Sequence, residues 1–219
     1  MASRTKSDET RARIHAAAIE LFRRNGFAQT TMREIAVAAG VAHGAAYYYF
    51  DSKEAIVLAF YGQAQQDLDP LLEAALGESR ELGKRIRALL DVKLRYFEGN
   101  RRLLGTLSAY TDPEHPLSPF SEQTRGIREN DIRFFDQAIS GSRTTVPDDL
   151  RPHLPRLLWL YQMGVILYWI YDRSPDQAKT RALLDKSLTL VVRLIKLAGF
   201  PLLRPLRRVA VDLIVTVAE

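Results

Sequence analysis

Cysteine is absent from the 219-residue chain, and its absence excludes several kinds of chemistry at once. Disulfide bridges, cysteine nucleophiles and thiolate-bound metal ions all need that side chain. A chain without disulfides is consistent with a reducing compartment, so we expect a cytoplasmic location. We expect neither a cofactor nor a metal site.

Long hydrophobic runs are also scarce. The longest one, residues 157–171, is interrupted by Gln162. A membrane-spanning helix needs roughly 20 apolar residues, so this run predicts a buried helix instead. The first residues, MASRTKSDETRARI, contain no apolar core of the signal-peptide type. No association with a membrane is therefore expected.

Sequence motifs of common enzymes are missing as well. The four histidines are far apart, and no H-E-x-x-H, G-x-S-x-G or G-x-x-x-x-G-K-[ST] pattern occurs. We therefore do not expect an enzyme. The alternative is a catalytic site in which folding brings the histidines together; they are His15, His43, His115 and His153.

The composition that remains is typical of a globular protein. Hydrophobic residues make up 47% and charged residues 26%, so the chain can bury a substantial core. The net charge is +5, and residues 1–33 hold seven basic side chains against three acidic ones. This local excess of positive charge favours a polyanionic partner, although only weakly at this size.

The hydrophobic pattern indicates an all-α fold. Apolar residues recur at spacings of three and four almost throughout, whereas the alternation typical of strands is not sustained. Two segments rich in Pro, Gly and Ser, residues 111–119 and 140–147, predict linkers. We expect helices near 8–25, 31–39, 42–48, 52–76, 80–98, 101–111, 120–140, 153–172, 176–198 and 203–218.

Two of the expected helices, 31–39 and 42–48, have the spacing of a helix-turn-helix, with Gly40 at the turn. In that motif the second helix enters the major groove of DNA. The small residues Gly44 and Ala45 would let its backbone approach base edges or phosphates, although glycine lowers helix stability. Tyr47 and Tyr48 would reach phosphates, sugars or thymine methyl groups, and the two aromatic residues that follow would pack in the core.

Several segments match one known pattern: Leu21-Phe22-x-x-x-Gly26-Phe27, Thr30-Thr31-Met32-Arg33-Glu34-Ile35-Ala36, Ala39-Gly40-Val41, Gly44-x-x-Tyr47-x-Tyr49-Phe50 and Lys53-Glu54. Through these motifs the sequence resembles the TetR family of transcriptional repressors. The resemblance covers residues 8 to about 58 and depends on several motifs at fixed spacing. It implies a DNA-binding domain over residues 1–52 and a helical effector-binding and dimerisation domain over residues 53–219.

The resemblance assigns contacts to individual residues. Phosphate contacts are implied for Thr31, Tyr47 and Lys53. Contacts to base edges or to the groove are implied for Arg33, His43, Ala45 and Tyr48, with Gly44 at the point of close approach. The chain departs from the family pattern at Ala42, where a Ser or Thr often caps the recognition helix.

Each of these assignments has a structural alternative. Arg33 could be a solvated surface charge, and Lys53 could support its own helix through the neighbourhood of Glu54. Arg4 and Lys6 would either enter the minor groove or form a disordered basic tail.

The expected helices near 153–172 and 176–198 are apolar around more than one face. A helix that packs both against its own domain and against a partner subunit needs such width, and a two-fold homodimer is the commonest arrangement. A dimer would also place two recognition helices in successive major grooves of double-stranded operator DNA. The alternative is a thick monomeric core.

Aromatic residues gather in the middle helices, where the resemblance implies an effector pocket. An apolar cavity with a few polar groups would bind a small, largely apolar effector of unknown identity, although aromatic residues at helical spacing also build plain cores. Such an effector would shift helix 52–76 and release the DNA. Activation in place of repression, and a ligand-independent scaffold regulated by a protein partner, remain alternatives. The candidate effector-binding residues are Tyr96, Tyr110, Phe134, Trp159, Gln162 and Trp169.

Overall fold

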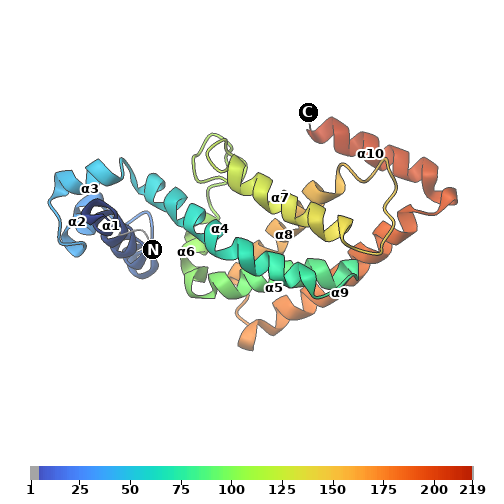
Figure 1. The fold of residues 1–219 in the computed structure, drawn as a ribbon, viewed down its shortest axis with the longest axis horizontal. Coiled ribbons are helices and arrows are strands. Elements are labelled where there is room, and N and C mark those ends of the chain that lie inside the picture. The colour runs from blue at the N-terminus through green and yellow to red at the C-terminus, as the bar shows by residue number, and fades with distance from the viewer. Residues whose placement is uncertain (1–4, 219) are drawn as a thin grey trace. The chain divides into compact units, whose positions relative to one another are not determined.

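The computed structural model describes residues 5–218, and every regular element in that range is a helix (Figure 1). The all-α prediction is confirmed, and most helix ends lie within three residues of their expected positions. The α-helices are α1 Lys6–Asn25, α2 Met32–Ala38, α3 His43–Tyr49, α4 Lys53–Gly77, α5 Leu82–Phe97, α6 Arg101–Leu107, α7 Arg125–Ser140, α8 Leu154–Tyr171, α9 Ala178–Ala198 and α10 Arg204–Ala218. Short 3-10 helices are η1 Glu98–Asn100, η2 Pro175–Gln177 and η3 Pro201–Leu203.

Two expected helix ends are wrong. Helix α6 stops at Leu107 instead of residue 111, and α7 begins at Arg125 instead of residue 120. The intervening segment is held in turns by hydroxyl groups: Ser121 Oγ donates to Pro116 O at 3.1 Å, and Thr124 Oγ1 donates to Ser118 O at 2.6 Å. Serine and threonine side chains that bond nearby carbonyls compete with helix formation. The apolar spacing alone did not show this competition.

The chain divides into two compact units. One contains residues up to 67 together with 97–128, and the other contains 68–96 together with the residues from 129 onward. Helix α4 contributes residues to both units. The predicted functional boundary between residues 52 and 53 does not coincide with this division, and it stays a prediction.

In the first unit, α1, α2 and α3 each turn one apolar face inward, at the helical spacing that the sequence shows. Helix α1 buries Ile14 and Phe22, α2 buries Ile35, and α3 buries Ala46 in one hydrophobic core. Helix α1 ends at Gly26, whose φ of 90° lies in the left-handed region that favours glycine. The apolar faces of the three helices therefore meet in one shared core.

The second unit contains the end of α4, α5, most of α7, and α8, α9 and α10. Its core contains Leu90 of α5, Phe134 and Phe135 of α7, and Trp169 of α8, all of which are buried. Helix α9 adds Leu184, which is 1% exposed. The described residues contain no helix that is long and apolar enough to cross a membrane.

Candidate DNA-binding site

The turn between α2 and α3 fixes the direction of the exposed helix. Thr31 caps α2: its hydroxyl accepts from the N–H of Glu34 at 3.2 Å, while the carboxylate of Glu34 accepts from the N–H of Thr31 at 2.7 Å. Gly40 then turns the chain with a φ of 64°. Helix α3 follows with Ala42 at its N-cap and without a side-chain cap, as its sequence predicts.

Helix α3 has one buried side and one open side. Ala46 is fully buried, and Phe50, directly after the helix, is 3% exposed. Tyr48 is 82% exposed and Tyr47 is 47% exposed, so both rings lie at the surface. Tyr49 is half-buried and packs against the core, which confirms the predicted inward position of the last two aromatic residues.

The exposed aromatic rings are held in fixed positions by their neighbours. The rings of His43 and Tyr47 meet edge to face with centroids 5.1 Å apart. Those of Tyr48 and Tyr49 meet in the same way at 5.2 Å. A ring that is already supported loses little conformational freedom on binding a partner. This side of α3 is therefore suited to contact an external surface.

Gly44 lies on the exposed side of α3, and nothing in the described structure requires a glycine at this position. Outside its own helix, no described atom lies within 4 Å of the place where its Cβ would stand, and its φ is ordinary. A glycine inside a helix costs about 1 kcal/mol relative to alanine. Its missing side chain leaves the backbone of α3 accessible from outside.

Three predicted contact residues lie outside α3. Thr31 and Arg33 are exposed at the start of α2. Lys53 begins α4, and its ammonium donates to Phe27 O at 2.8 Å and lies 4.7 Å from the centre of the Phe27 ring. Lys53 therefore stabilises the turn after α1. Its ammonium carries three donors, so a phosphate contact is compatible with this position and stays a prediction.

The N-terminal basic residues lie at the edge of what the structure describes. Lys6 is the first residue of α1, where Thr5 caps the helix through a capping box with Asp8. Arg4 lies outside the described residues. Lys6 is thus part of a helix, not of a disordered tail.

The pKa of Glu34 is lowered, first by the hydrogen bond from the backbone of Thr31 and then by that from its hydroxyl. The charged carboxylate accepts both bonds, so the capping box is complete above the ordinary pKa of glutamate and is lost as the pH falls through the lowered value. At neutral pH this start of α2 is fully formed.

Comparison with known proteins decides the family. Residues 14–60 match the model of bacterial regulatory proteins of the tetR family, and residues 85–213 match the model described as the tetracyclin repressor-like C-terminal domain. The chain belongs to the TetR family. It is a transcriptional regulator of the TetR type, whose helix-turn-helix lies within the residues described above.

Individual TetR relatives match only part of the chain. The regulator TtgR of Pseudomonas putida is 38% identical over 96 residues, which are 42% of this chain and 46% of TtgR. The alignment therefore spans less than half the length of that relative.

Solved TetR structures match most of the chain. FadR of Thermus thermophilus, solved with lauroyl-CoA, is 27% identical with a TM-score of 0.60 and covers 82% of this chain and 93% of its own. FadR of Bacillus subtilis, solved with stearoyl-CoA, is 20% identical with a TM-score of 0.63 and covers 83% of this chain and 97% of its own. The second of these likenesses supports the fold alone.

The residues predicted to bind an effector in this TetR protein do not all lie in one place. Phe134, Trp159 and Trp169 are buried in the second unit, where Tyr96 is half-buried. Tyr110 belongs to the first unit instead. It stacks on His115 with centroids 4.1 Å apart and packs against the core of the helix-turn-helix.

Gln162 lies at the centre of a buried polar network that also includes two residues absent from the sequence-based prediction. Its amide nitrogen donates to Asp131 Oδ2 at 2.8 Å, and its amide oxygen accepts from Lys93 Nζ at 2.9 Å. Lys93 and Asp131 form an ion pair at 2.6 Å, with the lysine side chain only 5% exposed. This network joins α5, α7 and α8. The sequence offers one local sign of this network: Lys93 lies within one helical turn of Leu89 and Leu90, which are both buried.

Proposed function

We propose that the protein is a homodimeric repressor that binds operator DNA through its two α3 helices and leaves it when a small-molecule effector binds. The observation that carries the proposal is the open side of α3. It combines a glycine that no described contact explains with two supported, exposed tyrosines, Tyr47 and Tyr48. Such a surface fits the major groove, which admits one helix.

The proposed contacts divide into two kinds. Thr31, Tyr47 and Lys53 would position the protein on phosphates, which fixes the register but carries no sequence information. Arg33, His43, Ala45 and Tyr48 would reach base edges or methyl groups. Gly44 would mark the closest approach.

Exposed apolar stripes on α8 and α9 support the proposed dimer. The stripe on α8 consists of Leu160, Leu167 and Tyr171, and the stripe on α9 contains Leu190 and Leu194. Within each stripe the residues recur at helical spacing. Gly164 lies within the α8 stripe, and outside its own helix no described atom occupies the space beside it. A small residue in an apolar stripe lets a second helix approach closely. The two stripes together would form a four-helix contact in a symmetric pair.

Leu194→Glu should convert the dimer into monomers. In a two-fold interface the substitution buries two carboxylates without partners, and we expect the dimer dissociation constant to rise by about 100-fold or more. Sedimentation velocity over a range of protein concentrations measures this change. The matched control is Leu71→Glu on α4, where the leucine is 50% exposed compared with 55% for Leu194. A wild-type monomer, or equal effects of both variants, would reject this interface.

The effector would bind in the second unit, beside the buried Lys93–Asp131–Gln162 network. Acyl-CoA thioesters are the first candidates, because FadR of T. thermophilus was solved with lauroyl-CoA and is 27% identical to this chain. An acyl chain matches the aromatic surroundings provided by Phe134 and Trp159. The effector must bind the DNA-free state more tightly than the DNA-bound state, and α4 contributes residues to both units.

A band-shift titration on DNA flanking the protein's own coding region tests this function. We expect selective binding over a shuffled duplex of equal length, and release when lauroyl-CoA or stearoyl-CoA is added. Free coenzyme A and the detergent dodecyl maltoside serve as controls for the head group and for an unspecific apolar chain. Absence of any sequence preference would refute the regulator proposal. Selective binding that no tested effector changes would favour the partner-regulated scaffold.

A further inference from the structure

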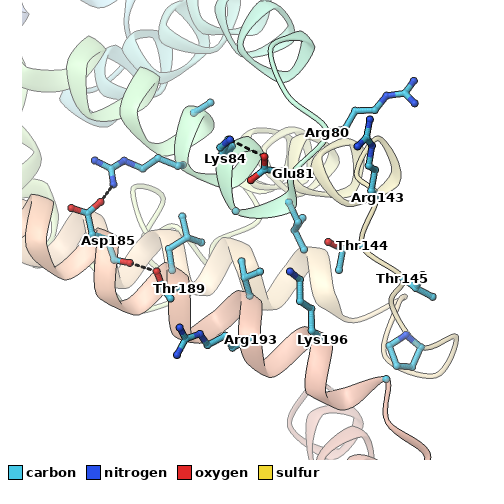
Figure 2. A pocket seen from close by; sticks show the side chains of 18 of the residues that line it. Arg80, Glu81, Lys84, Arg143, Thr144, Thr145, Asp185, Thr189, Arg193 and Lys196 are labelled. Carbon is cyan, nitrogen blue, oxygen red and sulfur yellow. Dashed lines mark hydrogen bonds and ion pairs between the residues drawn. The ribbon is translucent and has the colours of Figure 1, made fainter.

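A groove in the second unit has no role in the function proposed above. It has a volume of about 1510 Å³ and lies between α5, residues 143–149, α9 and the start of α10 (Figure 2). Leu82, Leu188 and Val192 form part of its apolar wall. Three segments that are distant in the sequence therefore supply one concave surface.

The groove carries a marked excess of positive charge. Ten basic and six acidic side chains line it, an excess of four. Residues 1–33 carry the same excess, with seven basic residues against three acidic ones, and there operator DNA is the proposed partner. The excess in the groove has no comparable partner among the described residues. Repulsion among like charges favours an anionic ligand that would neutralise them.

Only part of the basic residues in the groove form ion pairs. Lys84 pairs with Glu81 at 2.7 Å, Arg87 pairs with Asp91 and Asp185, and Arg207 pairs with Asp149. The side chains of several others make no hydrogen bond or ion pair with any described residue. These unpaired groups are Arg80, Arg95, Arg143, Arg193, Lys196, Arg204 and Arg208.

Arg80 and Arg143 meet at one end of the groove because the backbone holds them there. The N–H of Arg143 donates to the carbonyl of Arg80 at 2.9 Å, and Figure 2 shows both side chains leaving that point. Lys196 extends from α9 into the groove beside Thr144, whereas the guanidinium groups of Arg80 and Arg143 point away from it (Figure 2). The pKa of Glu81 is lowered, mainly by Lys84 and in addition by Lys196 and Arg143, so this carboxylate lies within electrostatic reach of all three.

A buried arginine beneath the groove makes this arrangement rigid. Arg85 is 8% exposed and donates to Ser79 O at 2.8 Å and to Ala138 O at 2.8 Å, so it ties the end of α4 to the end of α7. Gly141 allows this, because a Cβ there would collide with the guanidinium of Arg85. The chain segments that carry Arg80 and Arg143 are thus fixed before any ligand arrives.

We propose that this groove is a binding site for a small anion with several linked phosphate groups, held at one end of the groove by Arg80 and Arg143. Two guanidinium groups present paired donors that match phosphate oxygens in two-point contacts, and the other basic side chains of the groove add positive charge around them. The anion could come from a free nucleotide or from a phospholipid head group, since both present the same chemistry to these residues.

The site is separate from the proposed dimer surface. Helix α9 presents Leu188 and Ile195 to its own core, and Leu190 and Leu194 on an exposed stripe. Lys196, like Arg193, lies on the third side, between those two, because successive residues turn by about 100° around a helix. A dimer formed through the exposed stripe would therefore leave the groove accessible.

Isothermal titration with sodium tripolyphosphate at low ionic strength tests the proposal on the full-length protein. We expect saturable binding by the wild type. The double variant Arg80→Gln/Arg143→Gln should bind at least about tenfold more weakly, because it removes two charge-assisted contacts. The control Arg173→Gln/Arg181→Gln removes the same charge from exposed arginines outside the groove and should change the affinity less than about twofold.

Further ligands identify the source of the phosphate. Tighter binding of ATP than of tripolyphosphate would support a nucleotide, and co-sedimentation with vesicles of phosphatidylcholine and phosphatidic acid, lost in the groove variant, would support a lipid head group. Three results would overturn the proposal: no saturable heat with tripolyphosphate, equal weakening in groove and control variants, or equally tight binding of citrate. Because the titration contains no DNA, its outcome is independent of the repressor proposal.

Discussion

Replacing Tyr48 with alanine should weaken operator binding by about 100-fold while leaving the fold intact. The ring is 82% exposed and lies on the open side of α3, so the protein loses almost no core packing with it. A dimer loses the contact twice, and each lost groove contact is worth about 1 to 3 kcal/mol. Fluorescence anisotropy with labelled operator DNA measures the loss.

Tyr48→Phe separates the two contributions of this side chain. The phenylalanine keeps the ring and its edge-to-face contact with Tyr49, but it loses the hydroxyl. If the ring contacts a thymine methyl or a sugar, the affinity should stay within about threefold of the wild type; a phosphate contact through the hydroxyl predicts a larger loss. Unchanged operator affinity in Tyr48→Ala, with an unchanged melting temperature, would contradict the assignment of α3.

The second large effect is expected at Asp131. Leucine at this position should lower the free energy of unfolding by about 3 to 5 kcal/mol, because it leaves the buried ammonium of Lys93 without its ion pair. Urea denaturation at one fixed protein concentration measures the change, since the proposed dimerisation would make the stability depend on concentration.

The double variant Lys93→Met/Asp131→Leu should recover most of that loss. Two apolar side chains of similar volume can replace a buried ion pair at little cost, whereas an isolated charge cannot remain there cheaply. Asp69→Leu is the control, because that carboxylate accepts from Asn130 at 2.9 Å but lies at a partly exposed site. Its expected effect is below about 1 kcal/mol. A double variant as unstable as Asp131→Leu would show that the network stabilises through geometry other than charge pairing.

The sequence predicts what depends on local order. The faces of α1 and α2 follow from spacings of three and four, and the turn between α2 and α3 follows from Gly40, whose φ of 64° suits glycine. The open side of α3 follows in the same way, because only one side of a short helix can meet the core. The exposed tyrosines are therefore where their spacing puts them.

The features that the sequence did not predict depend on contacts between distant residues. Lys53 bonds a carbonyl 26 residues away, and Lys93 bonds the side chain of Gln162, 69 residues away. Neither partner can be deduced from spacing along one helix. Helix α7 begins only at Arg125 because hydroxyl groups before it bond to carbonyls in the turns around Ser118. The spacing of apolar residues does not encode these turns.

The basic groove illustrates the same limit. Its lining comes from α5, residues 143–149, α9 and α10, and each of these segments alone resembles an ordinary solvated surface. These arginines come together only in the folded chain, where Arg85 joins the ends of α4 and α7. Charge counts along the chain place the excess at the N-terminus and miss this second one.

The most direct test of the central claim, that α3 reads operator DNA as one of a symmetric pair, is a footprint on the DNA flanking the protein's own coding region. The proposed dimer predicts two protected half-sites with related, inverted sequences, whose centres lie about 34 to 36 Å apart or a multiple of that distance. Both should disappear together in Tyr48→Ala. Uniform protection without sequence preference, or two half-sites that persist in Tyr48→Ala, would contradict it.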